Sequence, residues 1–362
     1  MVSSIKKLYL CTLKFNMMKK IFCSLIVFCL FLSIGLFAQN AQKERKTAVL
    51  GFYNLENLFD TEDDPLTKDE QFLPEGSYRW TPERYMHKLD NMSKVISLIG
   101  REHGGVACLG LCELENRKVL EDLIATENLR PFNMDIVHYD SPDRRGVDVG
   151  FIYRKDRVEI LFSKPYRLVT EDTSFRTRDQ LLVSFVLDGT DTMHMIVNHW
   201  PSKLGGKKSL GSRAAAAKLT RHIADSLMNA DPNAKIVIVG DFNDDPDSKS
   251  IITNLKIKKK IEATTQPGDL FNPMYKLYKQ GYGSYAYRDA WGLIDQTIVS
   301  YGLVHARPGT YKYVAAKIFQ EPLILQKTQI GSYEDYPYRT YAGGTYQGGY
   351  SDHFPVYIIV NK

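Results

Sequence analysis

Short apolar segments recur along this chain, and acids, amides or histidines stand just past their ends. These polar residues are Asn54, Glu113, Asn198-His199, Asp241-Phe242-Asn243, Asp295 and Ser351-Asp352-His353. Apolar runs of about four to eight residues are typical of buried β-strands. Polar side chains at the strand ends of a packed sheet converge on one edge, where ligands of α/β proteins usually bind. We therefore expect these residues to form one polar site.

A few amphipathic helices are interspersed with the strands. The predicted helices cover residues 87–99, 117–124 (with Asn116 as N-cap) and 212–228. The predicted strands cover 48–53, 106–111, 135–139, 147–153, 180–187, 194–198, 235–239 and 354–360, with another at Ile298. Asp188-Gly189 predicts a hairpin turn, and residues 60–83 a long loop. Such a mixture predicts an α/β fold with two packed sheets and helices outside.

The first 38 residues have the pattern of a secretory signal peptide. Lys19 and Lys20 precede an apolar run of 17 residues, and Ala38 follows it. A positive segment, an apolar core and a small residue at the exit are typical of cleaved signals. The run is also at the short limit of a membrane span, so a membrane anchor is the alternative. Met17 or Met18 is the more plausible start, because either places the basic pair near the initiator.

This interpretation sets the domain organisation and the location. Residues 1–38 are the signal, 39–47 a polar linker, and 48–362 a single catalytic domain. The protein is then exported to the periplasm or the cell exterior, without stable insertion in the membrane after cleavage. No feature implies a protein partner, and we expect a monomer.

The charge of the chain argues against a globally basic nucleic-acid-binding protein. Five lysines of the leader account for the whole formal net charge of +5, so the remaining chain is neutral. Any contact with nucleic acid would therefore come from a local patch. Outside the leader the only cysteines are Cys108 and Cys112. On one strand they would lie roughly 13 Å apart, too far for a disulfide.

The residue types at the strand ends suit phosphoester chemistry. Carboxylate and amide oxygens bind hard divalent cations such as Mg²⁺. A histidine with an aspartate partner suits general base catalysis. Each motif also has an ordinary structural interpretation: residues 240–246 could be an Asx-rich turn, and Glu113 and Glu115 could be acids that favour a helix start.

Seven segments of the chain together resemble one family. They are FYNLENLFD, LCELEN, RRGVDVGFIYR, NHWPSK, VGDFNDDP, GLIDQTIVS and YSDHFPV, in this order over roughly residues 48–360. The order is similar to that of the endonuclease/exonuclease/phosphatase superfamily, which includes pancreatic-type deoxyribonucleases and apurinic endonucleases. The chain looks like a secreted bacterial branch of it. The resemblance implies a four-layer α/β sandwich and a phosphoesterase that depends on Mg²⁺ or Mn²⁺.

The resemblance also implies a role for individual residues. His353 would be the general base and Asp295 its partner, and three further residues would act in catalysis: His199, Asp241 and Asn243. The implied metal ligands are Glu113, Asp352, Asn54 and Asp241. Candidates for phosphate binding are Asn54, Arg178 and Arg145, although the ordinary interpretation of the two arginines as surface residues is slightly favoured.

The chain departs from the family pattern at several positions. Cys112 stands where the family commonly has glutamine, and Glu115 is a competing metal ligand. Asp148 lies within a predicted strand and needs a partner, either His199 or an arginine, unless it lies on an exposed edge. The tyrosine-rich segment Tyr333–Tyr350 could stack on nucleobases or sugars, or pack on the protein itself.

The sequence thus predicts an exported metal-dependent phosphodiesterase, most readily a nuclease that activates water with a histidine. The alternative is a phosphatase or phospholipase-like esterase that acts on sugar, inositol or lipid phosphates at the same site. A binding protein without catalysis is a third hypothesis, but such a protein would not need both histidines and all the carboxylates.

Overall fold

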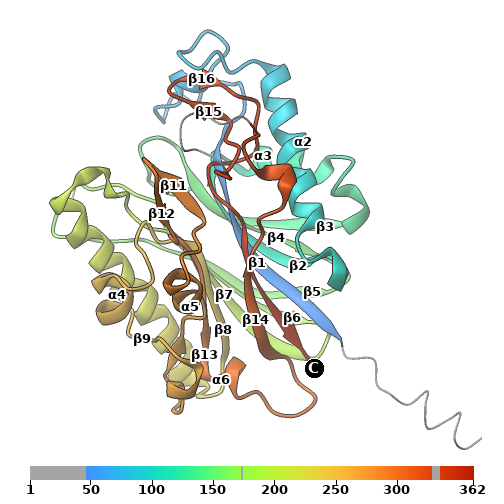
Figure 1. Cartoon of the computed structure of the whole chain (residues 1–362), viewed down its shortest axis with the longest axis vertical. Helices are drawn as coiled ribbons and strands as arrows, with labels where there is room; N and C mark the ends of the chain where they lie inside the picture. The colour runs from blue at the N-terminus through green and yellow to red at the C-terminus, as the bar shows by residue number, and fades with distance from the viewer. Residues whose placement is uncertain (1–45, 173, 328–334) are drawn as a thin grey trace, which may run out of the picture. The chain divides into compact units, whose positions relative to one another are not determined.

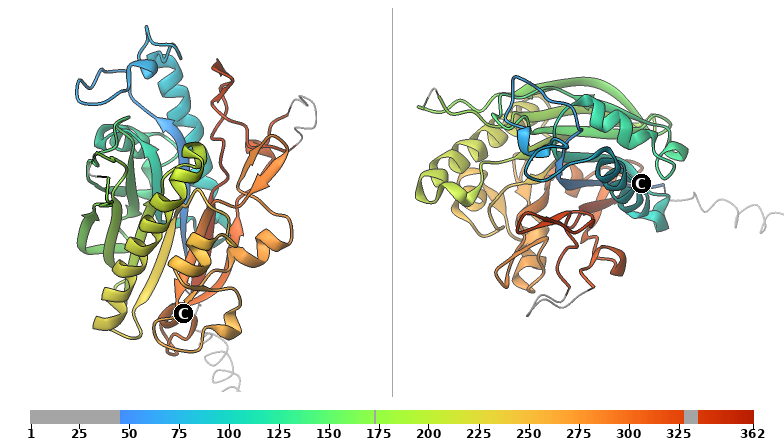
Figure 2. Two further views of the ribbon diagram at one scale, coloured as in Figure 1. Left: turned by 90° about the vertical axis from the view of Figure 1, so that its left-hand side faces the viewer. Right: turned by 90° about the horizontal axis from the view of Figure 1, so that it is seen from above.

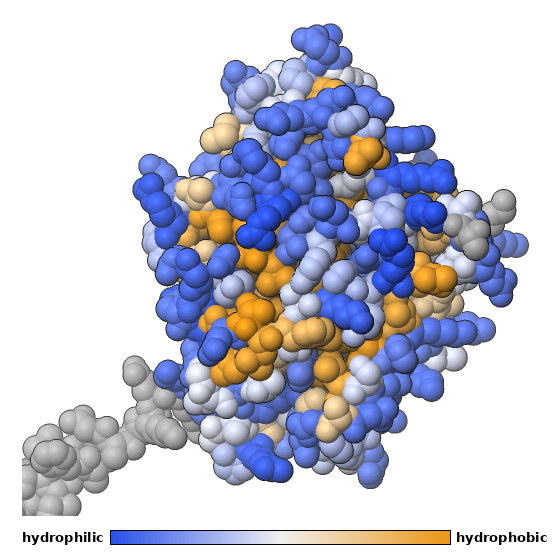
Figure 3. Space-filling view, turned by 180° about the vertical axis from the view of Figure 1, so that it is seen from behind, coloured by the Kyte–Doolittle hydropathy of each residue, from blue (hydrophilic) through white to orange (hydrophobic). Residues whose placement is uncertain are grey.

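The computed structural model describes residues 46–172, 174–327 and 335–362. The expected signal peptide and all but the last two residues of the expected linker lie outside the described residues. Residues Thr47–Lys362 form one compact unit. Within the described ranges, no helix has the length and apolar character needed to cross a membrane. The face seen in Figure 3 is mostly polar, with apolar residues gathered toward its middle.

Two large mixed sheets form the body of this unit (Figure 1). The six-stranded sheet has the order β14 (Lys312–Ile318), β17 (Val356–Asn361), β1 (Thr47–Leu58), β2 (Val106–Leu114), β4 (Asp148–Arg154) and β3 (Met134–His138). The seven-stranded sheet has the order β5 (Val158–Tyr166), β6 (Gln180–Leu187), β7 (Asp191–His199), β8 (Lys235–Asp241), β13 (Asp295–Ser300), β10 (Leu270–Phe271) and β9 (Ile257–Lys258). Parallel pairing joins β1 to β2, β7 to β8 and β9 to β10.

The sheets pack face to face because their strands are apolar on both sides. Leu50 of β1 lies in the cluster between the sheets, whereas its neighbour Val49 points to the opposite face. At Gly110 the sheets approach so closely that a Cβ would lie 2.9 Å from Val239 Cγ2. The expected pair of packed sheets is confirmed.

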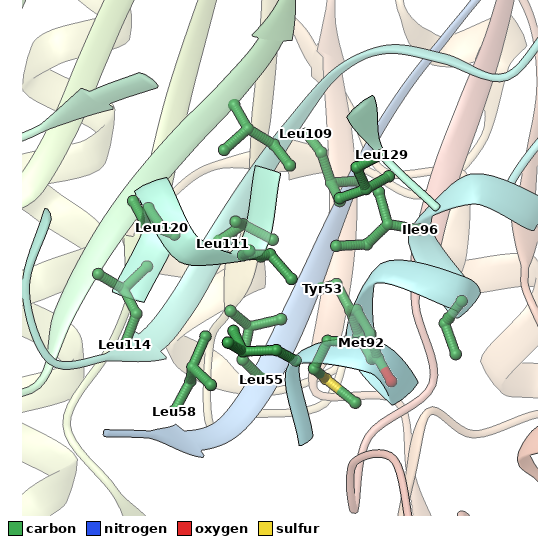
Figure 4. Packing of buried hydrophobic residues seen from close by; sticks show 14 of the residues in the cluster. Tyr53, Leu55, Leu58, Met92, Ile96, Leu109, Leu111, Leu114, Leu120 and Leu129 are labelled. Atoms are coloured by element: carbon green, nitrogen blue, oxygen red, sulfur yellow. The ribbon is translucent and has the colours of Figure 1, made fainter. Parts of the chain in front are cut away.

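Helices cover the two outer faces and complete the four layers (Figure 2). Helices α2 (Pro82–Leu98) and α3 (Arg117–Ala125) pack on the six-stranded sheet through a cluster that includes Met92, Ile96 and Leu120 (Figure 4). Helix α4 (Lys207–Ala230) packs on the seven-stranded sheet. Two short helices, α5 (Met274–Lys279) and α6 (Tyr301–Val304), and two small hairpins, β11–β12 (Tyr285–Tyr287 and Ala290–Gly292) and β15–β16 (Tyr341–Ala342 and Thr345–Tyr346), complete the fold.

The expected elements are present with shifted ends. The N-cap at Asn116 is confirmed, because its side chain accepts a hydrogen bond from the amide of Val119. The hairpin of β6 and β7 is confirmed, and Cys108 and Cys112 are both free and buried. Helices α2 and α4 each begin five residues earlier than expected. Pro82 explains the first case, because proline favours the first turn of a helix.

Candidate active site

Strand register brings the polar residues of the seven-stranded sheet together. Asp241, the last residue of β8, is aligned with His199 of β7 and with Asp295 at the start of β13. The preceding residue, Gly240, allows this arrangement, because a Cβ there would lie 2.4 Å from the carbonyl oxygen of Asn198. Three of the expected site residues therefore meet at one edge of this sheet.

Asn54 of β1 connects that edge to the six-stranded sheet. Its Nδ2 donates to Glu113 Oε1 and to Asp241 Oδ2, at 3.2 Å each, and its Oδ1 accepts from the amide of Glu56 at 2.9 Å. Since its oxygen is engaged by the backbone, Asn54 holds the two carboxylates as a hydrogen-bond donor. The expected role of Asn54 as a metal ligand stays a prediction.

A bulge at the end of β1 orients Glu113. Glu56 and Asn57 have φ values of 49° and 54°, and the amide of Asn57 donates to Glu113 Oε2 at 3.1 Å. Glu113 itself has a φ of 56°, next to a register shift between β2 and β4. Backbone in this left-handed region is uncommon for residues other than glycine and clusters at functional sites.

Glu113, His199 and Asp241 form a group that could hold a metal ion. Their ligand atoms lie within 4.8 Å of one another, and His199 Nε2 is 3.7 Å from both Glu113 Oε1 and Asp241 Oδ2. Burial, and then the charges of Asp295 and Glu113, raise the pKa of Asp241 to about 7. Burial thus disfavours the charged form of Asp241, which a divalent cation would favour, and the carboxylate oxygens of Glu113 and Asp241 suit a hard ion. Asp352 is not in this group; its Oδ1 is 3.6 Å from His353 Nε2.

His353 and Asp295 form a buried pair beside this group. His353 Nδ1 is 2.7 Å from Asp295 Oδ2. Burial acts to lower the pKa of His353, but the charges of Asp295, Asp352 and Asp241 outweigh it and raise this pKa well above its ordinary value. Because Nδ1 faces Asp295, the other ring nitrogen is left to accept a proton, as a general base requires.

Ser284 belongs to the same network, and the sequence analysis did not single it out. Its hydroxyl is fully buried and donates to Asp295 Oδ2 at 2.6 Å, the same oxygen that His353 contacts. The amide of Asp295 in turn donates to Ser284 Oγ at 3.1 Å. Ser284 lies just before β11, in a segment without a motif, so no signal in the sequence pointed to it.

We predict that Ser284→Ala lowers kcat by about 10- to 100-fold, because groups that orient a reacting residue have effects of this size. Ser300→Ala is the matched control. Ser300, like Ser284, is a buried serine whose hydroxyl makes two hydrogen bonds: it donates to Ala234 O and accepts from Ile236 N. It lies at the end of β13 that is opposite to Asp295. Both variants should lose thermal stability, and only Ser284→Ala should lose activity. Equal activity of the two variants in steady-state assays would contradict this role.

His199 is held in its neutral form. Burial, and then the charges of Arg178 and Arg145, lower its pKa well below the ordinary value. Its Nδ1 is buried and has no hydrogen-bond partner among the described residues. A neutral imidazole next to two carboxylates can hydrogen-bond a phosphate oxygen without repelling a cation held by these carboxylates.

These groups line one cavity of about 760 Å³. Its polar lining includes Glu113, His199, Asp241, Asn243, Asp352 and His353. Its lining also includes Tyr285, Tyr287 and Trp291 of the β11–β12 hairpin. The ring of Tyr285 lies 4.8 Å from that of His353. The cavity can therefore present a flat apolar surface next to the groups suited to phosphate chemistry.

The two candidate phosphate-binding arginines differ in their surroundings, although both line the cavity. Arg145 is about half exposed, with its Nε 3.5 Å from Asp143. Arg178 is buried, and its terminal nitrogens donate to Asp143 Oδ2 at 3.1 Å and Trp200 O at 2.6 Å. Arg145 is thus better placed to bind phosphate, whereas Arg178 is engaged within the protein.

Asn243 lies two residues after Asp241, in a turn, and has a φ of 50°. Its amide donates to Asp241 Oδ1 at 2.8 Å and its side chain donates to Trp200 O at 3.0 Å. The 240–246 segment is therefore both an Asx turn and part of the cavity wall.

Two expectations from the sequence are wrong. Glu115 does not compete with Glu113, because the chain turns at the end of β2 and Glu115 accepts from the amide of Asp60 at 2.8 Å. Asp148 pairs with neither His199 nor an arginine; it contacts His138 Nε2 at 2.9 Å, on the neighbouring strand.

The described part of the tyrosine-rich segment packs on the protein itself. Tyr341 contacts the rings of Tyr78, Trp80 and Tyr346, and no described residue from 335 to 350 lines the cavity. Tyr333 lies outside the described residues. The aromatic wall of the cavity comes instead from β11 and β12.

This chain belongs to the Endonuclease/Exonuclease/phosphatase family, whose sequence model matches residues 49–362. The family comprises enzymes that hydrolyse phosphoesters, typically with a divalent metal, and the acidic and histidine side chains at the site could bind one. Three solved structures share the fold. A mannosyl-6-phosphatase of Bacteroides thetaiotaomicron is 16% identical, with a TM-score of 0.53 over 86% of this chain and 99% of that one.

The second solved structure with this fold is D. rerio TDP2 in complex with a single-strand DNA product. It is 14% identical, with a TM-score of 0.52 over 87% of this chain and 99% of that one. The third, an endonuclease/exonuclease/phosphatase family protein of B. thetaiotaomicron, is 15% identical, with a TM-score of 0.52 over 88% and 98%. No curated protein sequence matches this chain significantly. At these identities the structures share the fold alone.

Proposed function

We propose that this protein is an exported, divalent-metal-dependent phosphodiesterase that cleaves nucleic acid. The observation that carries the proposal is the lining of one cavity. His353, which pairs with the buried Asp295, lies there together with the Glu113 and Asp241 carboxylates and three aromatic side chains. Aromatic side chains such as Tyr285, Tyr287 and Trp291 suit the stacking of nucleobases in single strands.

In the proposed reaction, His353 removes a proton from water, and Asp295 orients the imidazole and stabilises the imidazolium that forms. The water oxygen forms a bond to phosphorus, and the bond from phosphorus to the leaving oxygen breaks. Neutral His199 hydrogen-bonds a phosphate oxygen, and Arg145 attracts the anionic ester. Glu113 and Asp241 would hold Mg²⁺ or Mn²⁺, which would neutralise charge on the phosphate oxygens.

The second candidate is a phosphatase or phospholipase-like esterase for sugar, inositol or lipid phosphates. The neutral charge of the chain outside its leader favours it, because a nuclease that tracks along DNA usually has a basic surface. Hydrolysis of single-stranded and duplex oligonucleotides, compared with sugar, inositol and lipid phosphates, separates the two candidates. If the enzyme hydrolyses only the sugar, inositol or lipid phosphates and no oligonucleotide, the second candidate replaces the nuclease proposal.

We predict that EDTA abolishes hydrolysis and that added Mg²⁺ or Mn²⁺ restores it, because the ligand atoms of Glu113 and Asp241 lie close enough to hold one ion and the burial of Asp241 disfavours its charge without one. The measurement is initial rate against metal concentration, with Ca²⁺ and Zn²⁺ for comparison. Full activity in excess EDTA would contradict a metal-dependent mechanism.

Export is a separate part of the proposal and rests on the pattern of residues 1–38. Expression of the full chain in a Gram-negative host, followed by fractionation and N-terminal sequencing, tests it. We expect processed protein outside the cytoplasm that begins near Gln39. Unprocessed protein in the membrane fraction would support the anchor instead.

A further inference from the structure

We propose that Lys88 and Glu56 are positioning residues of the active site. Together they hold the segment 338–350 against helix α2 and so place Asp352 and His353 at the cavity. This inference rests on the proposed function for its link to catalysis, but the geometry on which it is built is independent of the substrate.

One face of α2 binds this segment. Four polar residues of that face follow helical spacing: Arg84, His87, Lys88 and Asn91. Lys88 Nζ donates to Thr340 Oγ1 at 2.5 Å and to Tyr350 O at 2.6 Å. Asn91 Nδ2 donates to the carbonyl oxygens of Gly348 and Gly349 at 3.2 and 2.9 Å.

Toward the N-terminus of α2, the same helix face contacts the β15–β16 hairpin of the segment. His87 Nδ1 is 2.9 Å from the hydroxyl of Tyr346, and the guanidinium of Arg84 lies 4.4 Å from the centre of the Tyr346 ring. Figure 1 shows β15 and β16 beside α2. The segment is therefore fixed to the helix along most of its length.

Glu56 holds the segment from the side of β1. Its Oε2 accepts from the amide of Thr340 at 2.7 Å, its Oε1 accepts from the amide of Tyr341 at 3.2 Å, and Lys88 Nζ lies 3.8 Å from its Oε2. Both side chains are buried. A buried ion pair is often no more stabilising than an apolar pair of similar size, so its benefit here is a defined position of the backbone that it binds.

The segment leads directly into the proposed catalytic residues. Tyr350, whose carbonyl oxygen accepts from Lys88, is followed by Ser351, Asp352 and His353. Ser351 Oγ donates to Asn54 O at 2.7 Å and accepts from the amide of His353 at 3.1 Å. A shift of the segment would therefore move His353 relative to Asp295. A displacement of about 1 Å in a catalytic group can lower a rate about 100-fold.

The test compares Lys88→Met and Glu56→Gln with a control on another part of α2. Ser93→Ala is the control, because Ser93 is a buried residue of α2 that contacts Asp90 O and Asn128 and not the segment. Two readouts are needed. The first is kcat and KM for the best substrate, and the second is the low-field proton NMR resonance of the His353 Nδ1–H that is hydrogen-bonded to Asp295.

We expect Lys88→Met to lower kcat by about 10- to 100-fold with KM changed less than about threefold. The His353 resonance should shift or broaden in Lys88→Met and Glu56→Gln, and remain unchanged in Ser93→Ala. The double variant should lose little more activity than either single one, because both act on the same segment. If Lys88→Met does not fold, Asn91→Ala, which removes only the two bonds to Gly348 and Gly349, should show the same changes to a smaller extent.

An unchanged His353 resonance together with kcat equal to that of Ser93→Ala would overturn the inference. If instead the proposed phosphodiesterase function is wrong, the experiment gives a different result. In that case wild-type protein would hydrolyse none of the esters, whereas the resonance of His353 would still report whether Lys88 and Glu56 position it.

Discussion

His353→Ala should lower kcat by about 10²- to 10⁴-fold, the range that general acid–base catalysis contributes in enzymes. The imidazole lies at the cavity with Nδ1 engaged by Asp295 at 2.7 Å, so its removal takes away the proton acceptor for the attacking water. The fold should survive, because His353 lines the cavity and packs against Tyr285 there. Steady-state kinetics with saturating metal, together with circular dichroism, would measure both parts.

His194→Ala is the matched control for this variant. His194 is a partly buried histidine of β7 that contacts Ser184 Oγ at 2.7 Å and does not line the cavity. It should leave kcat unchanged. If His353→Ala keeps more than about a tenth of wild-type kcat, His353 is not the general base.

The pH dependence of kcat/KM follows from the same pair. The charges of Asp295, Asp352 and Asp241 raise the pKa of His353 above its ordinary value despite burial. A base must be neutral to accept a proton, so kcat/KM should rise about tenfold per pH unit below this pKa and level off above it. Asp295→Asn removes one of these charges and should move the rising limb to lower pH. A rate that falls as pH increases from 6 to 9 would contradict this assignment.

The two packed sheets could be predicted from the sequence because the pattern of apolar residues within each strand determines which of its faces are buried. Segments such as residues 106–111 and 235–239 are apolar on both faces, and only a sheet between two apolar layers buries both. The polar residues at strand ends were also predictable as a group. Strand register then placed His199, Asp241 and Asp295 together, as the common edge of a sheet implies.

The errors arose where the backbone leaves regular geometry or where a partner is distant in sequence. Glu115 was a competing ligand by sequence because it lies two residues from Glu113, but the positive φ of Glu113 breaks the regular strand geometry between them. Ser284 contacts Asp295 only because the β11–β12 hairpin folds back to the start of β13. Tertiary contacts of this kind leave no periodic signal in the sequence.

Asp241→Asn should lower kcat by about 10²- to 10³-fold and, in EDTA at pH 8, raise the melting temperature by several degrees. The first effect follows from the loss of a charge that would hold the cation beside the phosphate. The second follows from the pKa of Asp241, which burial and the charges of Asp295 and Glu113 raise from 3.8 to about 7 in the folded protein. In the unfolded chain the carboxyl ionises near 3.8.

The size of this gain in stability depends on pH. Between about pH 4 and 7 the folded protein binds a proton that the unfolded chain has released, so the free energy of unfolding falls as pH rises through this window. Asparagine carries no charge and avoids this loss. The advantage of Asp241→Asn in EDTA should therefore be largest above pH 7 and vanish near pH 4. Added Mg²⁺ should reverse it, because binding to the folded state stabilises the wild type more.

Asp244→Asn gives the opposite result and is the control. Asp244 is also buried, but it pairs with Arg213 Nε at 2.9 Å and accepts from Ser250 Oγ at 2.6 Å. Removal of its charge leaves a buried arginine without its partner, which should lower the melting temperature with or without metal. Thermal denaturation of both variants at pH 4.5 and 8, in EDTA and in Mg²⁺, separates the two cases. A lower melting temperature of Asp241→Asn in EDTA at pH 8 would show that the Asp241 charge is already balanced without a cation.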